Sequence, residues 1–284
     1  MMIILDLNQV MISTLMASIG NHTNMDIDED LLRHMILNTI RANVKKFKGE
    51  YNELVIACDD KNYWRRDIFP HYKAHRKRDR EKSELDWNKI FKILNQVRDD
   101  LKEYFPYPVI QIERAEADDI IGTLTRSFGD ATDILILSGD KDFIQLHKYK
   151  NVKQYNPILK KYVSHDDPEM YLKEHIVKGD RGDGIPNIAS PDDVFVTGGR
   201  QKPVRKAMYQ ALIKSDIDEV ESGLDDLKRN WQRNRALVDL TQTPSSIVEK
   251  VLMEYNSQSA KTNRIMEYFT KHKLSSLLES VGDF

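Results

Sequence analysis

The sequence predicts an α/β fold, in which a central, parallel-rich, twisted sheet with flanking helices is followed by a helical C-terminal part. Three observations lead to this prediction. Four short apolar runs in the first half are continuous rather than alternating, as expected for strands buried on both faces of a parallel sheet. Amphipathic helical patterns separate the runs. Beyond about residue 165, strand signals fade and helical patterns dominate.

The elements follow one another in that order. The predicted strands occupy residues 2–5, 54–58, 108–112 and 134–137. Residues 28–47 place their apolar side chains on one broad face, which predicts a helix between the first two strands. Further helices are expected at 204–213, 223–240, 244–256 and 264–281.

These elements suggest two parts. Residues 1–165 are expected to form an α/β domain that includes a basic bridge at 61–87. Residues 166–284 are expected to form a helical part with a helix-turn-helix-like element near 172–210.

Composition narrows the class of protein. The 43 basic and 45 acidic residues nearly cancel, so the net charge by itself indicates no partner. The single cysteine, Cys58, excludes an internal disulfide and a Cys-rich zinc site, and is expected to be a small apolar core residue. The N-terminus lacks a basic n-region and reaches Asp6 too early for a secretory signal, and no apolar run is long enough to span a membrane. We therefore expect a cytoplasmic protein without membrane contact.

Each apolar run is followed by acidic residues. The carboxyl ends of parallel strands share one edge of a sheet, so these acids are expected to converge there. They are Asp6, Asp59, Glu116, Asp118, Asp119, Asp140 and Asp142. Asp140 and Asp142, two residues apart, would repel each other without a cation between them.

The acids of "ERAEADDIIGTLTRSF" fall in the first turn of a predicted helix. Glu116 and Asp119 share a face of this helix and Asp118 is offset by one position. The helix dipole alone favours acids there, but it does not explain why the same edge collects the other carboxylates. A Cys-free and His-free set of oxygen ligands suits two Mg²⁺ ions, with Mn²⁺ as a substitute, rather than zinc.

Two further segments carry nucleic-acid signals. Residues 61–82 contain nine Lys or Arg against three acids. A charge run is often only a solvated surface, but here it is interleaved with Tyr63, Trp64, Phe69 and Tyr72, which is typical of segments that bind phosphates and stack on exposed bases. In "VKGDRGDGIPNI", Asp180 and Asp183 lie in a Gly-rich turn whose backbone amides can approach a phosphate. Together with the acidic edge, these segments indicate phosphodiester hydrolysis.

Taken in order, these motifs resemble the flap endonuclease and 5′-nuclease family, which includes the 5′-nuclease domain of bacterial DNA polymerase I. The resemblance rests on Asp6, on "ACDD" followed by "YWRRDIFPHYKAHR", and on "EADD", "SGDKDF" and "GDRGDGIPNI". The segments "YWRRD", "QLHKYKNVKQYNP" and "ALVDL" are similar to the ribonuclease H of T-even-like bacteriophages, a branch of this family. Gly184 replaces the family's Asn and the usual Gly-Ile-Gly is displaced, which puts the family's monovalent-cation site in question.

The resemblance implies a PIN-like 5′-nuclease fold with a mobile bridge and two metal ions. It also implies that residues 1–165 are the catalytic domain and residues 166–284 the DNA-binding part. The implied metal ligands are Asp6, Asp59, Glu116, Asp118, Asp119, Asp140, Asp142, Asp180 and Asp183. Lys73 and Arg76 would contact the scissile phosphate, and Arg65 would guide the strand. Further contacts to nucleic acid are expected from Arg66, Tyr72, Lys202, Arg205 and Lys206, although the last three also fit the solvated start of a helix.

The implied activity is Mg²⁺-dependent 5′ to 3′ exonuclease and flap-endonuclease cleavage of RNA or DNA strands on duplex or flapped substrates. Its use would be the removal of RNA primers during lagging-strand replication, in the host cytoplasm if the protein comes from a phage. The implied partners are DNA and RNA–DNA hybrids with free 5′ ends. A sliding clamp and a single-strand-binding protein are plausible partners without a motif that fixes either contact, and a monomer is the family's usual state.

Other functions remain open from the residues alone. A haloacid-dehalogenase-like phosphatase needs an acid two residues after its first Asp, where this chain has Asn8. A catalytically silent module that binds branched DNA fits the fold, but it would keep crowded carboxylates that cost stability. Against a small toxin-type ribonuclease stand the long helical second half and the "GDRGDG" turn.

Overall fold

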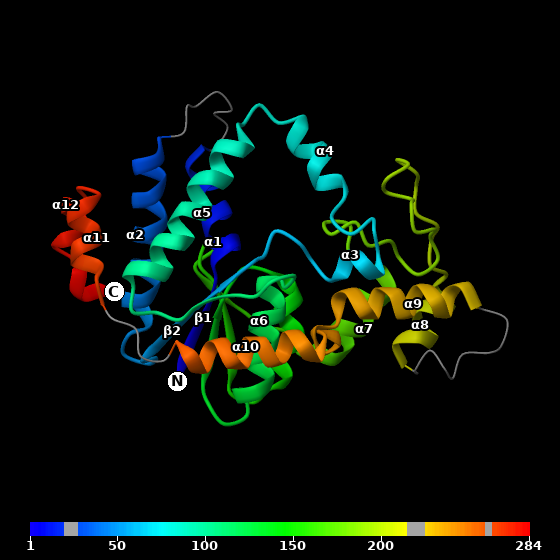
Figure 1. The fold of residues 1–284 in the computed structure, drawn as a ribbon. Coiled ribbons are helices and arrows are strands. Elements are labelled where there is room, and N and C mark those ends of the chain that lie inside the picture. Colours follow the sequence, from blue (N-terminus) through cyan, green and yellow to red (C-terminus); the bar gives the residue numbers. More distant parts are fainter. Residues whose placement is uncertain (20–27, 215–224, 259–262) are drawn as a thin grey trace.

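Six strands form one sheet in the order β3-β2-β1-β4-β5-β6. They are β1 (Met2–Asp6), β2 (Glu53–Cys58), β3 (Val109–Gln111), β4 (Ile134–Leu137), β5 (Val152–Asn156) and β6 (Lys161–Val163). The structure, a computed structural model, describes residues 1–19, 28–214, 225–258 and 263–284 (Figure 1). β1 to β5 are parallel and β6 is antiparallel to β5, so the predicted parallel-rich sheet is confirmed.

The four predicted strands are the four that begin the sheet in chain order. Their side chains are almost all buried, and Cys58 is fully buried as expected. The sequence analysis did not predict β5 and β6. In β5 polar residues interrupt the apolar ones, and β6 is an exposed edge strand.

The order of the strands reverses at β1. From β1 the chain moves outward through β2 to β3, and it then returns to the other side of β1 with β4. In open α/β sheets, the crevice at such a reversal is where ligands bind. The carboxyl ends of β1 and β4 therefore mark the expected site.

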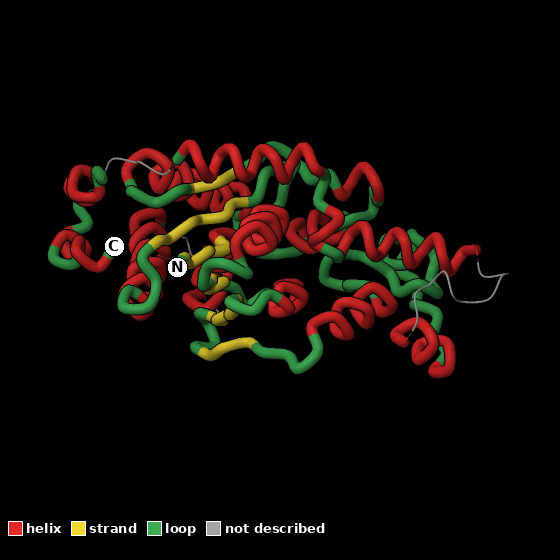
Figure 2. The backbone as a smooth tube through the Cα atoms, turned by 90° about the horizontal axis from the view of Figure 1, so that it is seen from below, coloured by secondary structure: helices red, strands yellow, loops and turns green. Residues whose placement is uncertain are grey.

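Helices cover both faces of the sheet (Figures 1 and 2). Ile3 and Leu5 of β1 face one core, which also contains residues of α1 (Leu7–Ile19), α2 (Glu29–Phe47), α5 (Trp87–Tyr104), α11 (Ile265–Lys271) and α12 (Ser275–Leu278). Met2 and Ile4 face the opposite core, built with α6 (Ala117–Phe128) and α10 (Ser245–Ser257). This split follows from the alternation of side chains along a strand.

A third core joins the basic bridge to the helical part. Phe69 and Tyr72 pack there against residues of α7 (Pro168–Lys178), α8 (Lys206–Lys214) and α9 (Asp225–Val238). The bridge itself contains two short helices, α3 (Arg65–Ile68) and α4 (His75–Glu81). The described residues also contain the short helices η1 (Lys141–Lys148), η3 (Leu240–Gln242) and η4 (Val281–Asp283). Residues beyond 166 thus contribute to all three cores.

The predicted helices of the second half are present with two differences. The helix expected at 264–281 is divided into α11 and α12 by a turn at Lys273, which has φ 52°. Of the helix expected at 223–240, residues 223–224 lie outside the described residues. α7 and α8 are joined by a long loop, residues 179–205, rather than by a tight turn. Within the described ranges, no helix combines the length and apolar character needed to cross a bilayer.

Candidate active site

A cavity of about 590 Å³ opens at the carboxyl ends of β1 and β4. Its acidic lining is Asp6, Asp59, Asp79, Asp118, Asp140 and Asp183, and its basic lining includes Lys73 and Arg76. We call it the acidic cavity. It lies where the strand order reverses, and the predicted convergence of the acids that follow the strands is confirmed for Asp6, Asp59, Asp118 and Asp140.

Asp6 and Asp59 are held by hydrogen bonds from neighbouring elements. Asp6 ends β1, and its carboxylate accepts hydrogen bonds from the Gln9 amide at 3.1 Å and the Ser138 hydroxyl at 3.0 Å. Asp59 follows β2 and accepts from the Asn8 side chain at 2.8 Å and from the Ala117 amide, at the start of α6, at 2.7 Å. Both carboxylates are thus oriented before any ligand binds.

The start of α6 sends its three acids in two directions. Glu116 is the N-cap, and the side chains of Glu116 and Asp119 form a capping box. Both bind the buried guanidinium of Arg65, each at 2.9 Å. Asp118, offset by one position, instead lines the acidic cavity. The predicted helical phase of these acids is therefore confirmed.

Asp119 does not have the position of a metal ligand, which corrects the prediction. It is fully buried, and its oxygens accept hydrogen bonds from Arg65, from the Trp64 indole at 3.1 Å and from the Thr243 hydroxyl at 2.9 Å. Its role is to hold the bridge and η3 against α6.

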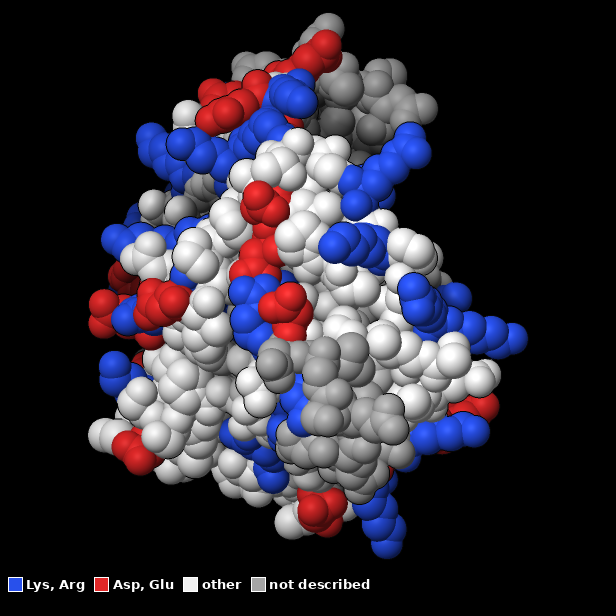
Figure 3. All heavy atoms as spheres, turned by 90° about the vertical axis from the view of Figure 1, so that its right-hand side faces the viewer, with Lys and Arg blue, Asp and Glu red and all other residues white. Residues whose placement is uncertain are grey.

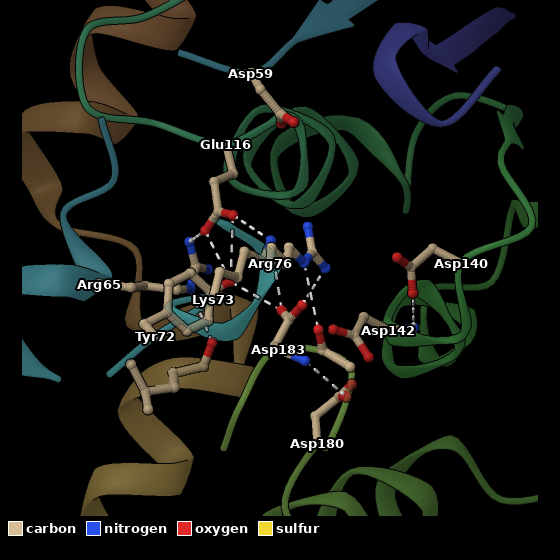
Figure 4. Close-up of polar contacts among 12 residues, drawn as sticks. Asp59, Arg65, Tyr72, Lys73, Arg76, Glu116, Asp140, Asp142, Asp180 and Asp183 are labelled. Atoms are coloured by element: carbon tan, nitrogen blue, oxygen red, sulfur yellow. Dashed lines mark hydrogen bonds and ion pairs between the residues drawn. The ribbon is translucent and has the colours of Figure 1, made fainter. Parts of the chain in front are cut away.

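Lys73 and Arg76 reach the acids from the bridge (Figure 4). The Lys73 ammonium lies 2.5 Å from a Glu116 oxygen and 3.5 Å from Asp183, and the Arg76 guanidinium lies 2.6 Å from Asp183. Lys73 has φ 55°, a conformation unusual for a residue other than glycine, and its amide donates to the Asp183 carbonyl at 2.8 Å. The bridge is thus joined at this point to the Gly-rich turn that contains Asp180 and Asp183, which we call the Gly-Asp turn.

Two residues predicted to contact nucleic acid are buried instead. Arg65 is 1% exposed, because its guanidinium binds Glu116, Asp119 and the Leu237 carbonyl. Tyr72 is 2% exposed, and its hydroxyl donates to Glu116 and Asp183. Trp64 and Phe69, expected to be stacking aromatics, are also buried.

Arg66 is exposed and lies over the Tyr63 ring, 4.8 Å from its centroid.

A second cavity of about 500 Å³ lies beside the first, and Asp140 lines both. Asp142, His175 and Asp180 line this second space, which we call the outer cavity. His175 Nδ1 is 3.3 Å from Asp142 and its Nε2 is 3.3 Å from Asp180. One atom from each of these three side chains lies within 4.8 Å of the others, an arrangement able to hold a metal ion.

His175 was not among the site residues that the sequence predicted. It lies in the last turn of α7, which packs beside η1, and this packing brings the imidazole between two carboxylates from different segments. Its position five residues before Asp180, just ahead of the Gly-Asp turn, was the available sequence signal.

The electrostatics of the site favour the binding of cations, because the clustered carboxylates have raised pKa values. Burial, together with the nearby charge of Asp59, raises the pKa of Asp6 from 3.8 to about 7. Burial also raises the pKa of Asp142 to about 8 despite the opposing effect of His175. The pKa values of Asp59, Asp118 and Asp140 are raised too, with burial as the main cause. Bound cations would remove this cost, so the donor set fits hard divalent ions.

The Gly-Asp turn needs its glycines for packing. Gly179 has φ 68°, and a Cβ there would lie 2.4 Å from the Ile185 carbonyl oxygen. Gly184 has φ 74° and is buried against His71 and His75. Gly184 therefore faces the bridge, and the expectation that the backbone of this turn is open to a phosphate is wrong at this residue.

The three basic residues predicted at the start of the helical region lie elsewhere. Lys202, Arg205 and Lys206 are exposed, and the first two line a separate cavity of about 410 Å³ between the 179–205 loop, α8 and α9. Figure 3 looks onto this end of the molecule and shows basic side chains along both margins of the face. Their position leaves a role in duplex binding as a prediction.

Comparison with known proteins agrees with this geometry. Residues 2–178 match the family model described as the 5′-3′ exonuclease, N-terminal resolvase-like domain, and residues 166–284 match that of the T4 RNase H C-terminal region. Ribonuclease H of Enterobacteria phage T4 is 34% identical over 291 residues, which cover 99% of this chain and 95% of that protein. DNA polymerase I of Bacillus caldotenax is 24% identical over 267 residues, which cover 87% of this chain and 28% of the polymerase.

Solved structures show the same fold. The flap endonuclease of bacteriophage T5, crystallised with DNA and metal ions, has a TM-score of 0.63 at 17% identity and covers 91% of this chain and 98% of its own. A T5 protein co-crystallised with metal ions has a TM-score of 0.62 at 18% identity, covering 91% and 99%. With a family model matching more than half of the residues and the phage T4 enzyme similar along nearly all of them, the chain belongs to the 5′-3′ exonuclease family of nucleases, as a relative of phage T4 ribonuclease H.

Proposed function

We propose that this protein is a divalent-metal-dependent 5′-nuclease that cleaves RNA or DNA strands with a free 5′ end on duplex and flapped substrates. The observation that carries the proposal is the acidic cavity itself. Four carboxylates from four segments, Asp6, Asp59, Asp118 and Asp140, meet there with raised pKa values beside Lys73 and Arg76. Such crowding is unfavourable without cations and is well suited to holding them.

Two Mg²⁺ ions, or Mn²⁺ in their place, are the proposed cofactors. Asp6, Asp59, Asp118 and Asp140 would hold one ion in the acidic cavity. Asp142, His175 and Asp180 of the outer cavity, with Asp183 from the acidic cavity, would hold the other. When bound, such ions supply the Lewis acidity that activates water and neutralise the charge that develops on the phosphoryl oxygens. Glu116 can join the ligands once Lys73 turns to a phosphate.

The protein's own basic groups would then bind the substrate. Lys73 and Arg76 are at present paired with Glu116 and Asp183. With cations on those carboxylates, both side chains become free to donate hydrogen bonds to the scissile phosphate. Attack by water forms a new P–O bond and breaks the bond to the 3′ oxygen, which leaves a 5′-phosphate and a 3′-hydroxyl. No side-chain nucleophile is needed.

The proposed biological task is removal of RNA primers and adjacent DNA during lagging-strand replication. The bridge at residues 61–87 would admit a single strand and exclude a duplex. Because its relative comes from a phage, action in the cytoplasm of the infected cell belongs to the same proposal. A monomeric state and contacts to a sliding clamp or a single-strand-binding protein stay predictions.

The proposal is tested with a 5′-flapped duplex and a DNA–RNA hybrid, labelled on the strand with the free 5′ end and incubated with Mg²⁺ or with EDTA. Mg²⁺-dependent cuts near the junction, or successive removal from the 5′ end, are expected, with 3′-hydroxyl ends on the products. Tight binding without cleavage in either Mg²⁺ or Mn²⁺ would instead support a silent DNA-binding module. Hydrolysis of p-nitrophenyl phosphate without nuclease activity would support a phosphatase.

A further inference from the structure

The acidic cavity has a second wall of a different kind. Ile12, Trp87 and Phe91 line it together with Arg80, in the same space as the carboxylates. Ile12 and Trp87 are partly buried and pack against the core, whereas neither core packing nor the binding of metal ions and a phosphate accounts for the ring of Phe91. The wall therefore calls for a ligand that is apolar on one side and anionic on the other.

Trp87 and Phe91 form one surface. They lie one turn apart on α5, with ring centroids 5.7 Å apart and an interplanar angle of 35°. The core-facing residues of α5, such as Ile90 and Leu94, are buried, whereas Phe91 is 39% exposed. Phe91 is thus not needed to fill the core. The Arg80 guanidinium lies 5.5 Å from the centre of its ring.

The indole of Trp87 is incompletely satisfied. Its Nε1 is shielded from solvent and has no hydrogen-bond partner among the described residues. A shielded donor without an acceptor costs about 1–3 kcal/mol. Because Trp87 lines the cavity, a ligand bound there could supply the acceptor that this N–H lacks.

Other aromatic residues of the bridge cannot serve as this surface. Trp64, Phe69 and Tyr72 are buried. Tyr63 lines the cavity, but Arg66 and Lys73 lie over its ring and the Tyr72 ring packs edge-on against it. Within residues 61–91, all of which the structure describes, Trp87 and Phe91 are the aromatic pair left facing the cavity.

We propose that Trp87 and Phe91, flanked by Arg80, form a stacking site for an unpaired base of the strand whose phosphate lies among the carboxylates. This inference rests on the proposed function and assigns residues that select for single strand. Every base has an apolar face that stacks on aromatic rings and on Arg, whatever the sequence. In a duplex those faces are already covered by neighbouring bases. The wall therefore favours an unpaired nucleotide of either RNA or DNA.

The test measures binding rather than cleavage. All proteins carry Asp140→Asn, and fluorescence anisotropy in Mg²⁺ reports their affinity for a 5′-flapped duplex. In a series of otherwise identical substrates, one flap nucleotide at a time near the junction is replaced by an abasic residue. At one position, loss of the base should weaken binding about 5- to 100-fold, as expected for one stacked base.

The aromatic variants identify the partner of that base. The parent here is the protein that carries Asp140→Asn alone. With Phe91→Ala or Trp87→Leu added, the affinity for the complete flap should fall to the affinity of the parent for the flap with the abasic residue. The abasic residue should then cause no further loss of affinity. Phe91→Tyr should restore both. Tyr162→Ala removes an exposed aromatic side chain from β6, which does not line the cavity, and should behave as the parent.

The two proposals fail in different ways. If the parent shows no abasic penalty at any position, or if both variants retain it in full, the stacking site is wrong even though the native enzyme cleaves. If the native protein binds flaps with a base-dependent affinity but never cuts them, the nuclease proposal fails and the stacking site stands. Matching thermal unfolding of the variants excludes a folding defect.

Discussion

The ammonium of Lys73 lies 2.5 Å from a carboxylate oxygen of Glu116, one of the shortest contacts between the bridge and the sheet edge. Without a divalent ion, the chain neutralises part of its acidic edge with its own lysine. The raised pKa of Lys73 follows from the same contacts, since Tyr72, Asp183 and Glu116 together outweigh the effect of burial. The side chain expected to contact the substrate is thus held at the site before substrate arrives.

Lys73→Ala should slow the chemical step by about 10²- to 10³-fold, the loss expected for one preorganised charged donor, while substrate affinity falls much less. Single-turnover cleavage of a flapped duplex at saturating enzyme separates the two effects. Lys77→Ala, which removes an exposed lysine from α4, is the matched control and should retain the parent rate. A wild-type single-turnover rate for Lys73→Ala would remove Lys73 from the reaction.

Asp140→Asn should abolish cleavage, because Asp140 lines both cavities and its loss affects both proposed metal sites. Binding of the flapped duplex should persist, since the basic residues remain. Gel assays with Mg²⁺ and anisotropy on the same protein measure the two properties. Asp193→Asn alters an exposed acid outside both cavities and serves as the control. Full activity of purified Asp140→Asn would exclude Asp140 from the site.

Metal-free stability should fall as the pH rises from about 4 to about 8. Asp6 has a native pKa of about 7 and Asp142 of about 8, against 3.8 ordinarily, so the native state binds more protons than the unfolded state in this window. For Asp6 the difference is equivalent to at most ~4 kcal/mol. In EDTA at pH 8, Asp6→Asn should therefore unfold at a higher temperature than the parent.

Mg²⁺ provides the control for that experiment. It should raise the melting temperature of the parent more at pH 8 than at pH 5, because the carboxylates it neutralises are ionised only at the higher pH. Asp6→Asn should gain less from Mg²⁺ at pH 8. Equal melting temperatures of the parent at pH 5 and pH 8 in EDTA would mean that the carboxylates are not crowded as described.

His175 should tune the choice of metal. Imidazole nitrogen suits transition-metal ions better than Mg²⁺, which prefers oxygen. His175→Asp should therefore lower the ratio of Mn²⁺ to Mg²⁺ affinity severalfold, as measured by calorimetric titration of the full chain. A nitrogen coupling from histidine in the electron-spin-echo spectrum of the Mn²⁺-loaded parent should disappear in the variant. An unchanged spectrum would show that His175 does not bind the ion.

Lys202→Ala should weaken duplex binding without slowing the chemical step. The side chain is exposed on the loop between α7 and α8, outside both acid-lined cavities. Losing one phosphate contact should lower the slope of log affinity against log salt by about 0.9. Lys150→Ala, an exposed lysine between η1 and β5, provides a charge-matched control. If the salt slope of Lys202→Ala equals that of the parent, Lys202 is only a solvated residue.

The sequence predicted those parts of the structure that depend on local pattern. Continuous apolar runs indicated the four buried parallel strands, and the acids that follow them met at one edge. β5 escaped prediction because buried polar residues such as Gln154, which bonds the Ser138 carbonyl at 2.9 Å, interrupt its apolar pattern. A sequence pattern does not reveal such a partner.

The side-chain roles that were predicted wrongly or missed depend on contacts between residues far apart in the sequence. Arg65 was expected to face a nucleic acid because its neighbours are basic, yet its partners Glu116 and Asp119 lie more than fifty residues away in sequence. Asp119 was predicted as a ligand like Asp118, although a rotation of about 100° around α6 separates them. His175 was missed because its two carboxylate partners come from η1 and the Gly-Asp turn.

The acids of the acidic cavity span residues 6 to 183, and the support of α6 extends further, to the hydrogen bond from Thr243 to Asp119. A growing chain on the ribosome cannot assemble this arrangement until most of its length has been synthesised and released from the exit tunnel. Partial products of translation therefore lack a complete site.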